Sequence, residues 1–277
     1  MIEIGKYNTL KIVKDLDFGV YLDGGNDLEI LLPARYVPKN VKPGDEVEVF
    51  IYHDNEGRLI ATTAKPHATV GEFKFMEVKS VNQVGAFLDW GIMKDLLVPF
   101  KEQRVAMKEG RWYLVYVRLD HVSQRIMASA RIEKFLNNTP PTYKVNEEVN
   151  ILIIDETEIG YKVIINNSHT GLLYHNEVFQ RLEKGEERKA YVKAIREDEK
   201  IDLSLTKLGY DKIDGVASII LESLEAQGGF LGVHDKSEPE LIYSLFRCSK
   251  KSFKQAIGTL YKQKRITIEE DGIRLIK

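Results

Sequence analysis

Apolar and polar residues alternate through most of residues 1–207, as they do in strands that bury one face. In residues 45–52, DEVEVFIY, Val47 and Val49 are separated by a glutamate. Successive side chains of a strand point to opposite sides of a sheet, so this pattern predicts a strand with one side toward a core. Five short strands are predicted at the start of the chain: 2–13, 18–23, 28–33, 45–52 and 58–63.

This strand pattern occurs three times along the chain. The segment VKPGDEVEVFI around Gly44 is followed by MKEGRWYLVYV around Gly110 and by LEKGEERKAYV around Gly185. Three further sets of segments repeat with these offsets: FGVYLD, VGAFLD and IGYKVI; ILLP, LLVP and GLLY; IATT, IMAS and IDLS. In this alignment Ile60 corresponds to Ile126. Four anchors with common offsets predict three copies of one structural unit.

Each copy has a glycine at the start of its second strand: Gly19, Gly85 and Gly160. Glycine inside a strand commonly marks a bulge or a sharp bend, which a small barrel requires at its corners. Five curved strands in about 70 residues predict a closed barrel, and the OB-fold is the five-stranded candidate. An SH3-like barrel is the alternative.

After Tyr210 the hydrophobic period changes from 2 to 3.6, which indicates helices. A first helical stripe ends at the Gly228–Gly229 pair. The tetrapeptide SEPE at residues 237–240 has the form of a capping box, in which Ser237 accepts from an amide and Glu240 reaches back, and it predicts a helix through Phe246. The residues of the first stripe are Ile213, Val216, Ala217, Ile220 and Leu224.

A third helix is predicted after Ser249, followed by a hairpin with its turn at Asp271–Gly272. Three helices and a hairpin predict a winged helix-turn-helix. The buried side of the third helix is predicted to be Phe253, Ala256, Ile257 and Leu260. A basic stripe on its opposite side consists of Lys251, Lys254, Lys262 and Arg265. The fold class is therefore mainly β with an α+β C-terminal domain, and the predicted domains are 1–65, 66–140 and 141–207 for the barrels and 208–277 for the winged helix.

Composition narrows the classes of function. The chain has 277 residues, 43% of them hydrophobic, a formal net charge of −2 and a single cysteine. It has no apolar run of membrane-spanning length, no signal peptide, no disulfide framework and none of the common nucleotide-binding, hydrolase or metalloprotease motifs. We therefore expect a cytoplasmic, non-enzymatic protein without a metal or another cofactor. Its lone Cys248 is expected to be buried.

Charge is distributed unevenly among the predicted domains. Their formal net charges are −3, +3, −3 and +1, in chain order. Residues 247–265 contain seven basic and no acidic residues. Affinity for polyanions comes from Lys and Arg that displace counterions, so any nucleic-acid binding is expected to use local patches.

The repeated unit resembles the S1 RNA-binding domain, an OB-fold module. The third copy fits best: in TGLLYHNEVF, at residues 170–179, Tyr174 stands at the position usual for histidine and Asn176 at that usual for serine. In the first two copies Pro33 and Pro99 replace the polar residue of the pattern. Three such units followed by a winged helix resemble the conserved virulence factor B family. That resemblance implies RNA binding and post-transcriptional control of gene expression, including that of virulence factors.

OB-type barrels bind single strands by stacking bases on exposed aromatic rings while Lys and Arg contact the phosphates. The candidate stacking residues are Phe18 and Tyr21, Phe87 and Trp90, and Tyr161 and Tyr174, in the three copies. The candidate phosphate contacts are Lys74, Lys79, Arg104, Arg118 and Arg125 in the second copy and Lys162, His175, Lys193 and Arg196 in the third. Each aromatic residue has core packing, and each basic residue a solvated side chain, as its alternative role.

The predicted function is binding of single-stranded RNA over several barrels and the winged helix, because several weak sites on one chain raise the effective concentration for a flexible strand. Two alternatives remain at this point. One is a DNA-binding transcriptional regulator that reads the major groove with the basic stripe of the third helix. The other is a protein-interaction scaffold.

Overall fold

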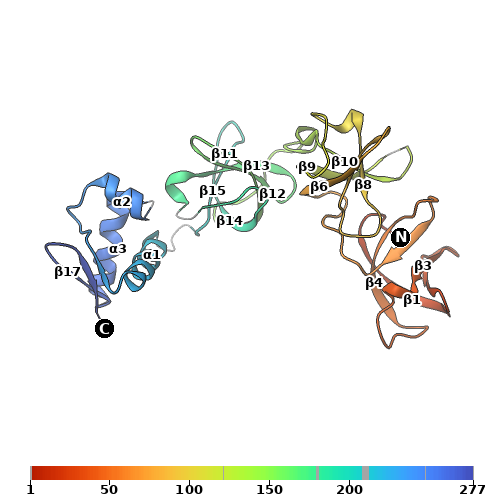
Figure 1. The fold of residues 1–277 in the computed structure, drawn as a ribbon, viewed down its shortest axis with the longest axis horizontal. Coiled ribbons are helices and arrows are strands. Elements are labelled where there is room, and N and C mark those ends of the chain that lie inside the picture. Colours follow the sequence, from red (N-terminus) through yellow and green to blue (C-terminus); the bar gives the residue numbers. More distant parts are fainter. Residues whose placement is uncertain (1, 121, 179–180, 208–211, 247, 277) are drawn as a thin grey trace. The chain divides into compact units, whose positions relative to one another are not determined.

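The computed structural model describes residues 2–120, 122–178, 181–207, 212–246 and 248–276, and the chain divides into two compact units, Met1–Leu136 and Asn137–Lys277. The first unit contains two five-stranded barrels, and the second contains a third barrel and the helical C-terminal region (Figure 1). This architecture confirms the predicted fold class. The four-domain division with its boundaries stays a prediction, and residue 208 lies outside the described residues.

Barrel 1 closes through the strand order β1-β2-β3-β5-β4, with β1 pairing to β4. Its strands are β1 (Tyr7–Leu16), β2 (Gly19–Asp23), β3 (Glu29–Pro33), β4 (Glu46–His53) and β5 (Leu59–Thr62). A short 3-10 helix, Ala34–Tyr36, follows β3. The first strand begins later than the predicted 2–13, because residues 4–6 form a turn. It also ends later, because β1 and β2 are joined by a tight hairpin that pairs Leu16 with Gly19.

Barrel 3 repeats this arrangement as a closed barrel, with the order β11-β12-β13-β15-β14. Its strands are β11 (Glu148–Thr157), β12 (Gly160–Ile165), β13 (His169–Tyr174), β14 (Glu187–Ile195) and β15 (Ile201–Ser204), and a 3-10 helix, His175–Glu177, follows β13.

Barrel 2 has the same order of strands along the chain, but hydrogen bonds do not close its sheet. Its sheet order is β10-β9-β6-β7-β8, and in the described residues its two edges, β8 and β10, lie beside each other without ladder pairing. The strands are β6 (Phe73–Val81), β7 (Gly85–Leu88), β8 (Leu96–Pro99), β9 (Trp112–Leu119) and β10 (Ile126–Ser129), and the 3-10 helices are Phe100–Glu102 and Ile132–Phe135.

The glycine that opens the second strand of each barrel is required by close approach to the third strand. Gly19, Gly85 and Gly160 have φ values of 148°, 154° and 159°. A Cβ on any of them would lie 2.1 to 2.3 Å from a carbonyl oxygen of the neighbouring strand. No side chain fits there without a backbone shift, which explains the glycine at these positions.

The fifth strand of barrel 1 lies one residue away from the repeat alignment. Thr62, Ser129 and Ser204 each end their strand, and each hydroxyl accepts a hydrogen bond from a backbone amide two residues later. Thr62 is therefore the equivalent of Ser129, where the alignment had used Thr63. The reason is that the turn between β9 and β10 is one residue longer than the turn between β4 and β5.

Barrels 1 and 2 share one hydrophobic core within the first unit. Phe50 and Tyr52 of β4 belong to the same buried cluster as Trp90 and the inner residues of barrel 2. The Phe50 and Trp90 rings meet edge to face with centroids 5.5 Å apart, and the Trp90 indole donates to the Ala68 carbonyl at 2.7 Å. The sequence pattern gave no sign of this shared core.

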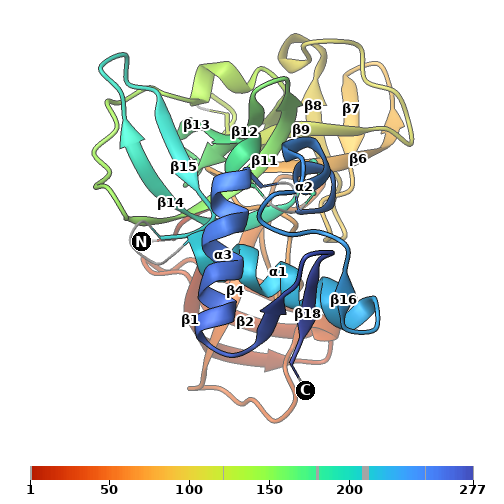
Figure 2. The same ribbon diagram turned by 90° about the vertical axis from the view of Figure 1, so that its left-hand side faces the viewer.

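The C-terminal region is a winged helix around a core of its own (Figure 2). It contains α1 (Lys212–Ala226), β16 (Phe230–Leu231), α2 (Pro239–Phe246), α3 (Lys250–Lys262), β17 (Ile266–Ile268) and β18 (Ile273–Leu275), and its sheet order is β16-β18-β17. The predicted stripes are buried, from Val216 to Leu224 on α1 and from Phe253 to Leu260 on α3. The side chain of Ile213, and also Phe179 and Arg247, lie outside the described residues.

One helix start differs from its prediction. The Ser237 hydroxyl accepts a hydrogen bond from the His234 amide at 2.9 Å, so it closes the preceding turn instead of capping a helix. Helix α2 begins at Pro239, which suits a first helical position because proline lacks the amide hydrogen. The N-cap of α3 is as predicted: Ser249 accepts from the Ser252 amide at 3.1 Å.

In the part of the chain that the structure describes, no helix is long and apolar enough to span a membrane.

Candidate nucleic-acid interface

The outer face of barrel 3 forms an open hollow of about 710 Å³ over β12, β13 and β15. The turn at residues 157–159 and the segment 196–200 border it. The second and third strands, together with the loops before the second and fifth strands, are the surfaces through which OB-folds bind oligonucleotides. The hollow therefore lies where this fold offers a strand-binding site.

Three polar side chains in the hollow hold one another. Arg196 Nε donates to Asp202 Oδ2 at 3.0 Å, and the Arg196 guanidinium also donates to the Tyr174 hydroxyl. The guanidinium carbon lies 5.9 Å from the centroid of the Tyr174 ring. Arg196 thus stands in a fixed position beside a half-buried ring, which suits a site that receives a base and a phosphate together.

Two further cations border the same hollow. Lys162 on β12 is exposed, and its ammonium has no ion pair in the described part of the chain. Lys200 pairs with Asp198, with Nζ and Oδ2 2.6 Å apart, on the exposed turn between β14 and β15. The floor between them includes the half-buried Leu172, so the hollow combines apolar, aromatic and cationic surface.

Lys193 and His175, also predicted as phosphate contacts, are engaged within the barrel. Lys193 forms an ion pair with the buried carboxylate of Glu177. His175 Nε2 lies 2.8 Å from the Thr157 carbonyl oxygen, and the ring meets Tyr161 edge to face. Neither side chain is among those that line the hollow.

Two of the predicted stacking residues, Trp90 and Tyr161, are buried. Trp90 is 2% exposed because it fills the core that barrels 1 and 2 share, so no base can stack on it. Tyr161 is 6% exposed because β12 turns its side chain inward, in register with Val163. The remaining predicted rings differ in exposure: Phe18 is 57% exposed, and Tyr21, Phe87 and Tyr174 are half-buried.

Phe18 and Tyr21 both reach the surface of barrel 1 because Phe18 lies in the turn before β2 and Tyr21 lies on the outer side of that strand. Phe18 precedes the strand, and its ring meets that of Tyr21 edge to face at 6.3 Å. Strict alternation would have placed them on opposite sides, but alternation holds only within the strand, which begins at Gly19.

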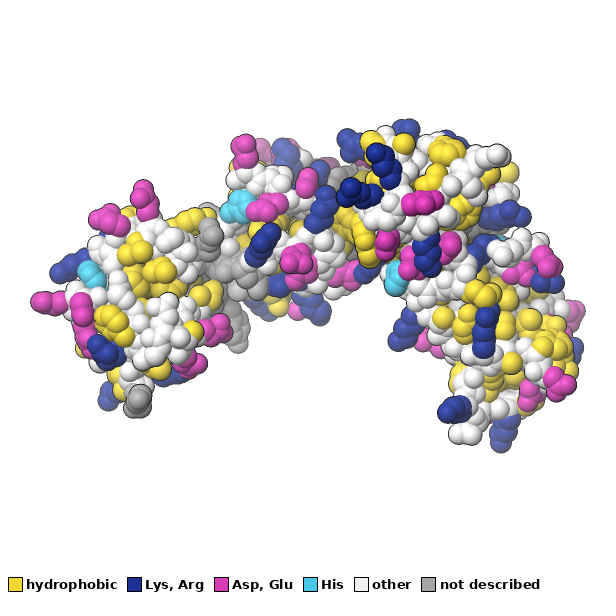
Figure 3. All heavy atoms as spheres, viewed as in Figure 1, with side chains coloured by type: hydrophobic (Ala, Val, Ile, Leu, Met, Phe, Trp, Pro, Cys, Tyr) yellow, Lys and Arg dark blue, Asp and Glu magenta, His cyan; other side chains and the backbone are white. Residues whose placement is uncertain are grey.

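The basic candidates of barrel 2 differ in their partners and in their exposure. Lys79 lies between two carboxylates, 3.0 Å from Asp89 and 3.2 Å from Asp95. Arg118 lies 3.7 Å from Glu102, whose side chain is buried. Lys74 is half-buried on β6, whereas Arg104 and Arg125 are exposed. Figure 3 likewise shows basic and acidic side chains interspersed over the visible face of each barrel.

The strand registers identify the residues of barrels 1 and 2 that stand where barrel 3 has its polar groups. Both barrels have an aromatic residue in place of the lysine, proline in place of the tyrosine, aspartate in place of the arginine and an aliphatic side chain in place of the aspartate. The equivalents of Lys162, Tyr174, Arg196 and Asp202 are Tyr21, Pro33, Asp54 and Ile60 in barrel 1, and Phe87, Pro99, Asp120 and Met127 in barrel 2.

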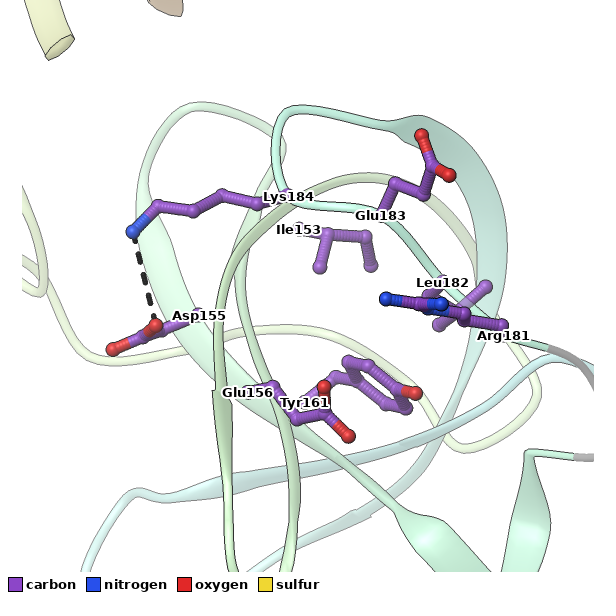
Figure 4. Close-up of a pocket in the computed structure, with 8 residues that line it drawn as sticks. All are labelled: Ile153, Asp155, Glu156, Tyr161, Arg181, Leu182, Glu183 and Lys184. Carbon is purple, nitrogen blue, oxygen red and sulfur yellow. Dashed lines mark ion pairs between the residues drawn. The ribbon is translucent and has the colours of Figure 1, made fainter. Parts of the chain in front are cut away.

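A second, smaller hollow of about 280 Å³ lies on barrel 3, at the end of β11 (Figure 4). The Tyr161 ring lies at its base, and Asp155 pairs with Lys184 across it at 3.7 Å. Glu156 and Glu183 also line it beside Arg181. Three carboxylates against two cations make this hollow unfavourable for a polyanion.

The predicted basic stripe of the winged helix is exposed. Lys251, Lys262 and Arg265 have exposed side chains, and Lys254 is exposed 3.7 Å from Asp235. The wing hairpin carries acidic groups: Glu269, which accepts from Arg274 at 3.1 Å, and the exposed Glu270 and Asp271. A duplex placed against α3 and the wing together would meet charges of both signs.

Residues with potential for other chemistry are engaged or buried. Among the described residues no group of three or more His, Cys, Asp or Glu side chains is arranged to hold a metal ion. Cys248 is buried, and burial raises the pKa of its thiol to about 11, which leaves it in the unreactive thiol form at neutral pH.

Known families match the two ends of the chain. Residues 4–64 match the S1 domain family, and residues 218–275 match the CvfB-like winged helix domain.

Relatives match almost the whole chain. Two proteins named "Conserved virulence factor B" are similar to it: one from Staphylococcus epidermidis is 27% identical over 283 residues, covering 99% of this chain and 95% of that protein. The other, from Staphylococcus aureus strain USA300, is 28% identical over 284 residues, covering 99% and 94%. A solved structure described as a multidomain protein with nucleic acid binding domains from Streptococcus pneumoniae is 24% identical, covers 99% of this chain and 98% of that one, and superposes with a TM-score of 0.43.

Proposed function

The chain belongs to the conserved virulence factor B family, and from this premise we propose that it is an RNA-binding regulator that acts post-transcriptionally on gene expression. It has S1 and winged-helix domains, which are nucleic-acid-binding types. The name of its relatives supports virulence factors as the genes concerned. The partner we propose is single-stranded RNA.

The observation that carries this proposal is the hollow on barrel 3. Tyr174, Arg196 and Lys162 meet there on the face that OB-folds use for strands, and Asp202 fixes the arginine. Its volume of about 710 Å³ is within the range of small-molecule sites and accommodates one or two nucleotides. The Tyr174 ring supplies a stacking surface, and Arg196 and Lys162 supply phosphate contacts.

The exposed ring of Phe18 with Tyr21, and the basic stripe of α3, are the second and third contacts that we propose. Each has a carboxylate close to the binding surface. Barrel 1 has rings but an aspartate, Asp54, where barrel 3 has its arginine, and in α3 Lys254 lies 3.7 Å from the carboxylate of Asp235. These sites are therefore expected to add to the affinity of barrel 3 through effective concentration, each with a smaller contribution.

The test uses the full chain and a single-stranded RNA 20-mer labelled for fluorescence anisotropy, at several salt concentrations. Tyr174→Ala is expected to weaken binding by about 1–3 kcal/mol, the usual value of one base–ring stack. Tyr174→Phe retains the ring and loses only the hydroxyl, so it is expected to stay close to the unmodified protein. Equal loss in both variants would show that the hydroxyl holds Arg196 and that the ring itself binds nothing.

The control is Arg111→Gln, which removes an exposed cation of barrel 2 outside the hollow. It is expected to change affinity much less than Arg196→Gln. Duplex DNA bound at least as tightly as the RNA, or RNA binding that is insensitive to every change in the hollow, would overturn the proposal.

A DNA-binding regulator led by the winged helix is the second candidate, supported by the exposed stripe on α3. Removal of residues 208–277 separates the two functions. RNA binding is expected to persist through barrel 3 if the first proposal holds, whereas loss of all nucleic-acid binding would favour the second.

A further inference from the structure

A lysine of barrel 2 reaches across the seam between the two barrels of the first unit. Lys94 lies between β7 and β8, and its Nζ donates to the His53 carbonyl at 2.7 Å and to the Asp54 carbonyl at 2.9 Å, at the end of β4 in barrel 1. Its side chain is half-buried there. The ammonium therefore has two neutral partners, and no carboxylate is paired with it among the described residues.

An arginine of barrel 2 stands beside the same turn of barrel 1. Arg125 precedes β10, and its Nη2 would lie 3.6 Å from a Cβ added to Gly57. Its guanidinium is exposed and has no hydrogen bond or ion pair within the described ranges. Gly57 has no side chain to cover the guanidinium, so the donors of Arg125 stay accessible to a ligand.

The charge of Arg125 acts on Lys94 at the seam. Burial, and then the charge of Arg125, lower the pKa of the Lys94 ammonium. Burial, and then the charges of Lys94 and Arg125, lower the pKa of His53. A half-buried ammonium whose pKa is lowered by a neighbouring cation marks a place of unbalanced positive charge, and a bound anion gains affinity there.

The nearby carboxylates are already engaged. Asp54 Oδ1 accepts from the amides of Glu56 and Arg58, both at 2.9 Å, and Oδ2 accepts from Arg58 Nε at 2.8 Å. Glu56 pairs with Arg58 at 2.9 Å. One guanidinium thus neutralises much of both carboxylates, and Lys94 and Arg125 keep an excess of positive charge at the seam.

We propose that Lys94 and Arg125 form an anion site at the seam of barrels 1 and 2, and that this site takes a phosphate group. The guanidinium offers two parallel N–H donors to phosphate oxygens, and the lysine adds the donor that its two carbonyl partners leave over. Its assignment to a phosphate of the RNA strand rests on the proposed function, whereas the anion site itself does not.

The first experiment uses inorganic phosphate and the full chain. Phosphate is added to one sample of the protein and chloride to another, at matched ionic strength. ¹H–¹⁵N spectra follow the Gly57 amide and the Arg125 Nε–H in both. Saturable shifts at these groups with phosphate, absent with chloride, are expected for the unmodified protein and for Arg111→Gln, and they are expected to disappear in Arg125→Gln. Arg125→Gln breaks no contact that holds the seam, so its fold is expected to be intact. Shifts that are equal for phosphate and chloride, or that persist in Arg125→Gln, would overturn the site.

The second experiment identifies the source of the phosphate. Arg125→Gln is expected to weaken binding of the RNA 20-mer several-fold at low salt. It is also expected to reduce the slope of log K against log salt by about 0.7, the value for one phosphate contact on a single strand. An unchanged slope together with phosphate shifts would overturn the strand assignment and point to a free phosphorylated molecule. Tyr174→Ala, which tests the hollow on barrel 3, is expected to leave the phosphate shifts unchanged, so the two proposals fail separately.

Discussion

Barrel 3 and barrel 1 have the same five-stranded topology but present opposite chemistry at matching positions. Where barrel 3 has Arg196, barrel 1 has Asp54, and where barrel 3 has Asp202, barrel 1 has Ile60. Barrel 2 agrees with barrel 1 in both cases. The outer face has therefore diverged within one chain while the barrel stayed the same.

The comparison shows which positions determine the fold and which determine binding. The strand-opening glycines, and the hydroxyl residues that end the fifth strands, serve the same purpose in all three barrels. The side chains at the four outer-face positions differ between barrel 3 and the other two barrels, so the common topology does not depend on their charge or aromatic character. Binding in this protein is expected to depend on the barrel's outer face, and an S1 label alone does not locate it.

The largest expected effect tests the difference between barrels 1 and 2, which share a core, and barrel 3, which has a core of its own. Trp90→Ala removes the largest side chain of the shared core and is expected to cost about 3–5 kcal/mol of unfolding free energy. The loss should appear in barrels 1 and 2 together and leave barrel 3 unaffected. Urea unfolding followed by amide exchange measures this. The control is Trp112→Ala, at a position 63% exposed, which should cost much less; a loss confined to barrel 2 would contradict the shared core.

The next effect tests what the barrels have in common. Gly160→Ala places a Cβ 2.1 Å from the Leu173 carbonyl oxygen and is expected to destabilise barrel 3 by about 2–4 kcal/mol, measured by chemical denaturation. Gly85→Ala should act similarly on barrel 2. Gly258→Ala in α3, where a Cβ meets open space, is the control and should be neutral or stabilising. Tolerance of alanine at residue 160 would mean that the strand-opening glycine is not required.

A smaller effect is expected when the outer face of barrel 3 is made more like that of barrel 1. Arg196→Asp places a second carboxylate beside Asp202 and removes a cation from the hollow. RNA affinity is expected to fall about ten- to a hundredfold, with a weaker salt dependence, in anisotropy titrations. Lys144→Asp, the same charge change at an exposed position outside the hollow, serves as the control. An equal loss in both variants would mean that only net charge matters.

The smallest effect concerns the charged cluster of barrel 2. The hydrogen bond from Lys79 holds the pKa of the Asp89 carboxyl below its usual range. A depressed pKa stabilises the folded state above the unfolded value of about 3.9, and this stabilisation is lost as pH falls through the folded value.

Lys79→Met is therefore expected to reduce stability near neutral pH and to flatten the pH dependence below about pH 4. The side chains of Lys79 and Asp89 are 46% and 38% exposed, so solvent screening limits the loss to a few tenths of a kcal/mol. Thermal unfolding across pH 2–7 measures it, and a steeper dependence in the variant would contradict this assignment.

Sequence periodicity predicted the elements well because each barrel strand buries one side and each helix of the winged region buries one stripe. The stacking role predicted for Trp90 is wrong, because the sequence of one barrel does not show that a neighbouring barrel covers this side chain. The prediction for Ser237 failed, because the capping-box pattern also fits a serine that closes a preceding turn. The alignment of the fifth strand failed by one residue because a longer turn cannot be distinguished from a shifted strand by sequence alone.

The site was predicted in part. Lys162, Tyr174 and Arg196 were among the candidates and lie in one hollow, whereas Asp202 was missed. A signal was present, because aspartate is uncommon inside strands and Asp202 lies in the short strand that pairs with the one leading to Arg196. The seam between Lys94 and the end of β4 had no sequence signal, since it depends on how two barrels pack together.

The core that joins barrels 1 and 2 also means that the two barrels cannot be separated without cost. Phe50 and Tyr52 would face water if the chain were cut after residue 65, and Trp90 would lose its neighbour. Neither barrel 1 nor barrel 2 can therefore be lost, moved or expressed alone without exposing an aromatic surface that promotes aggregation.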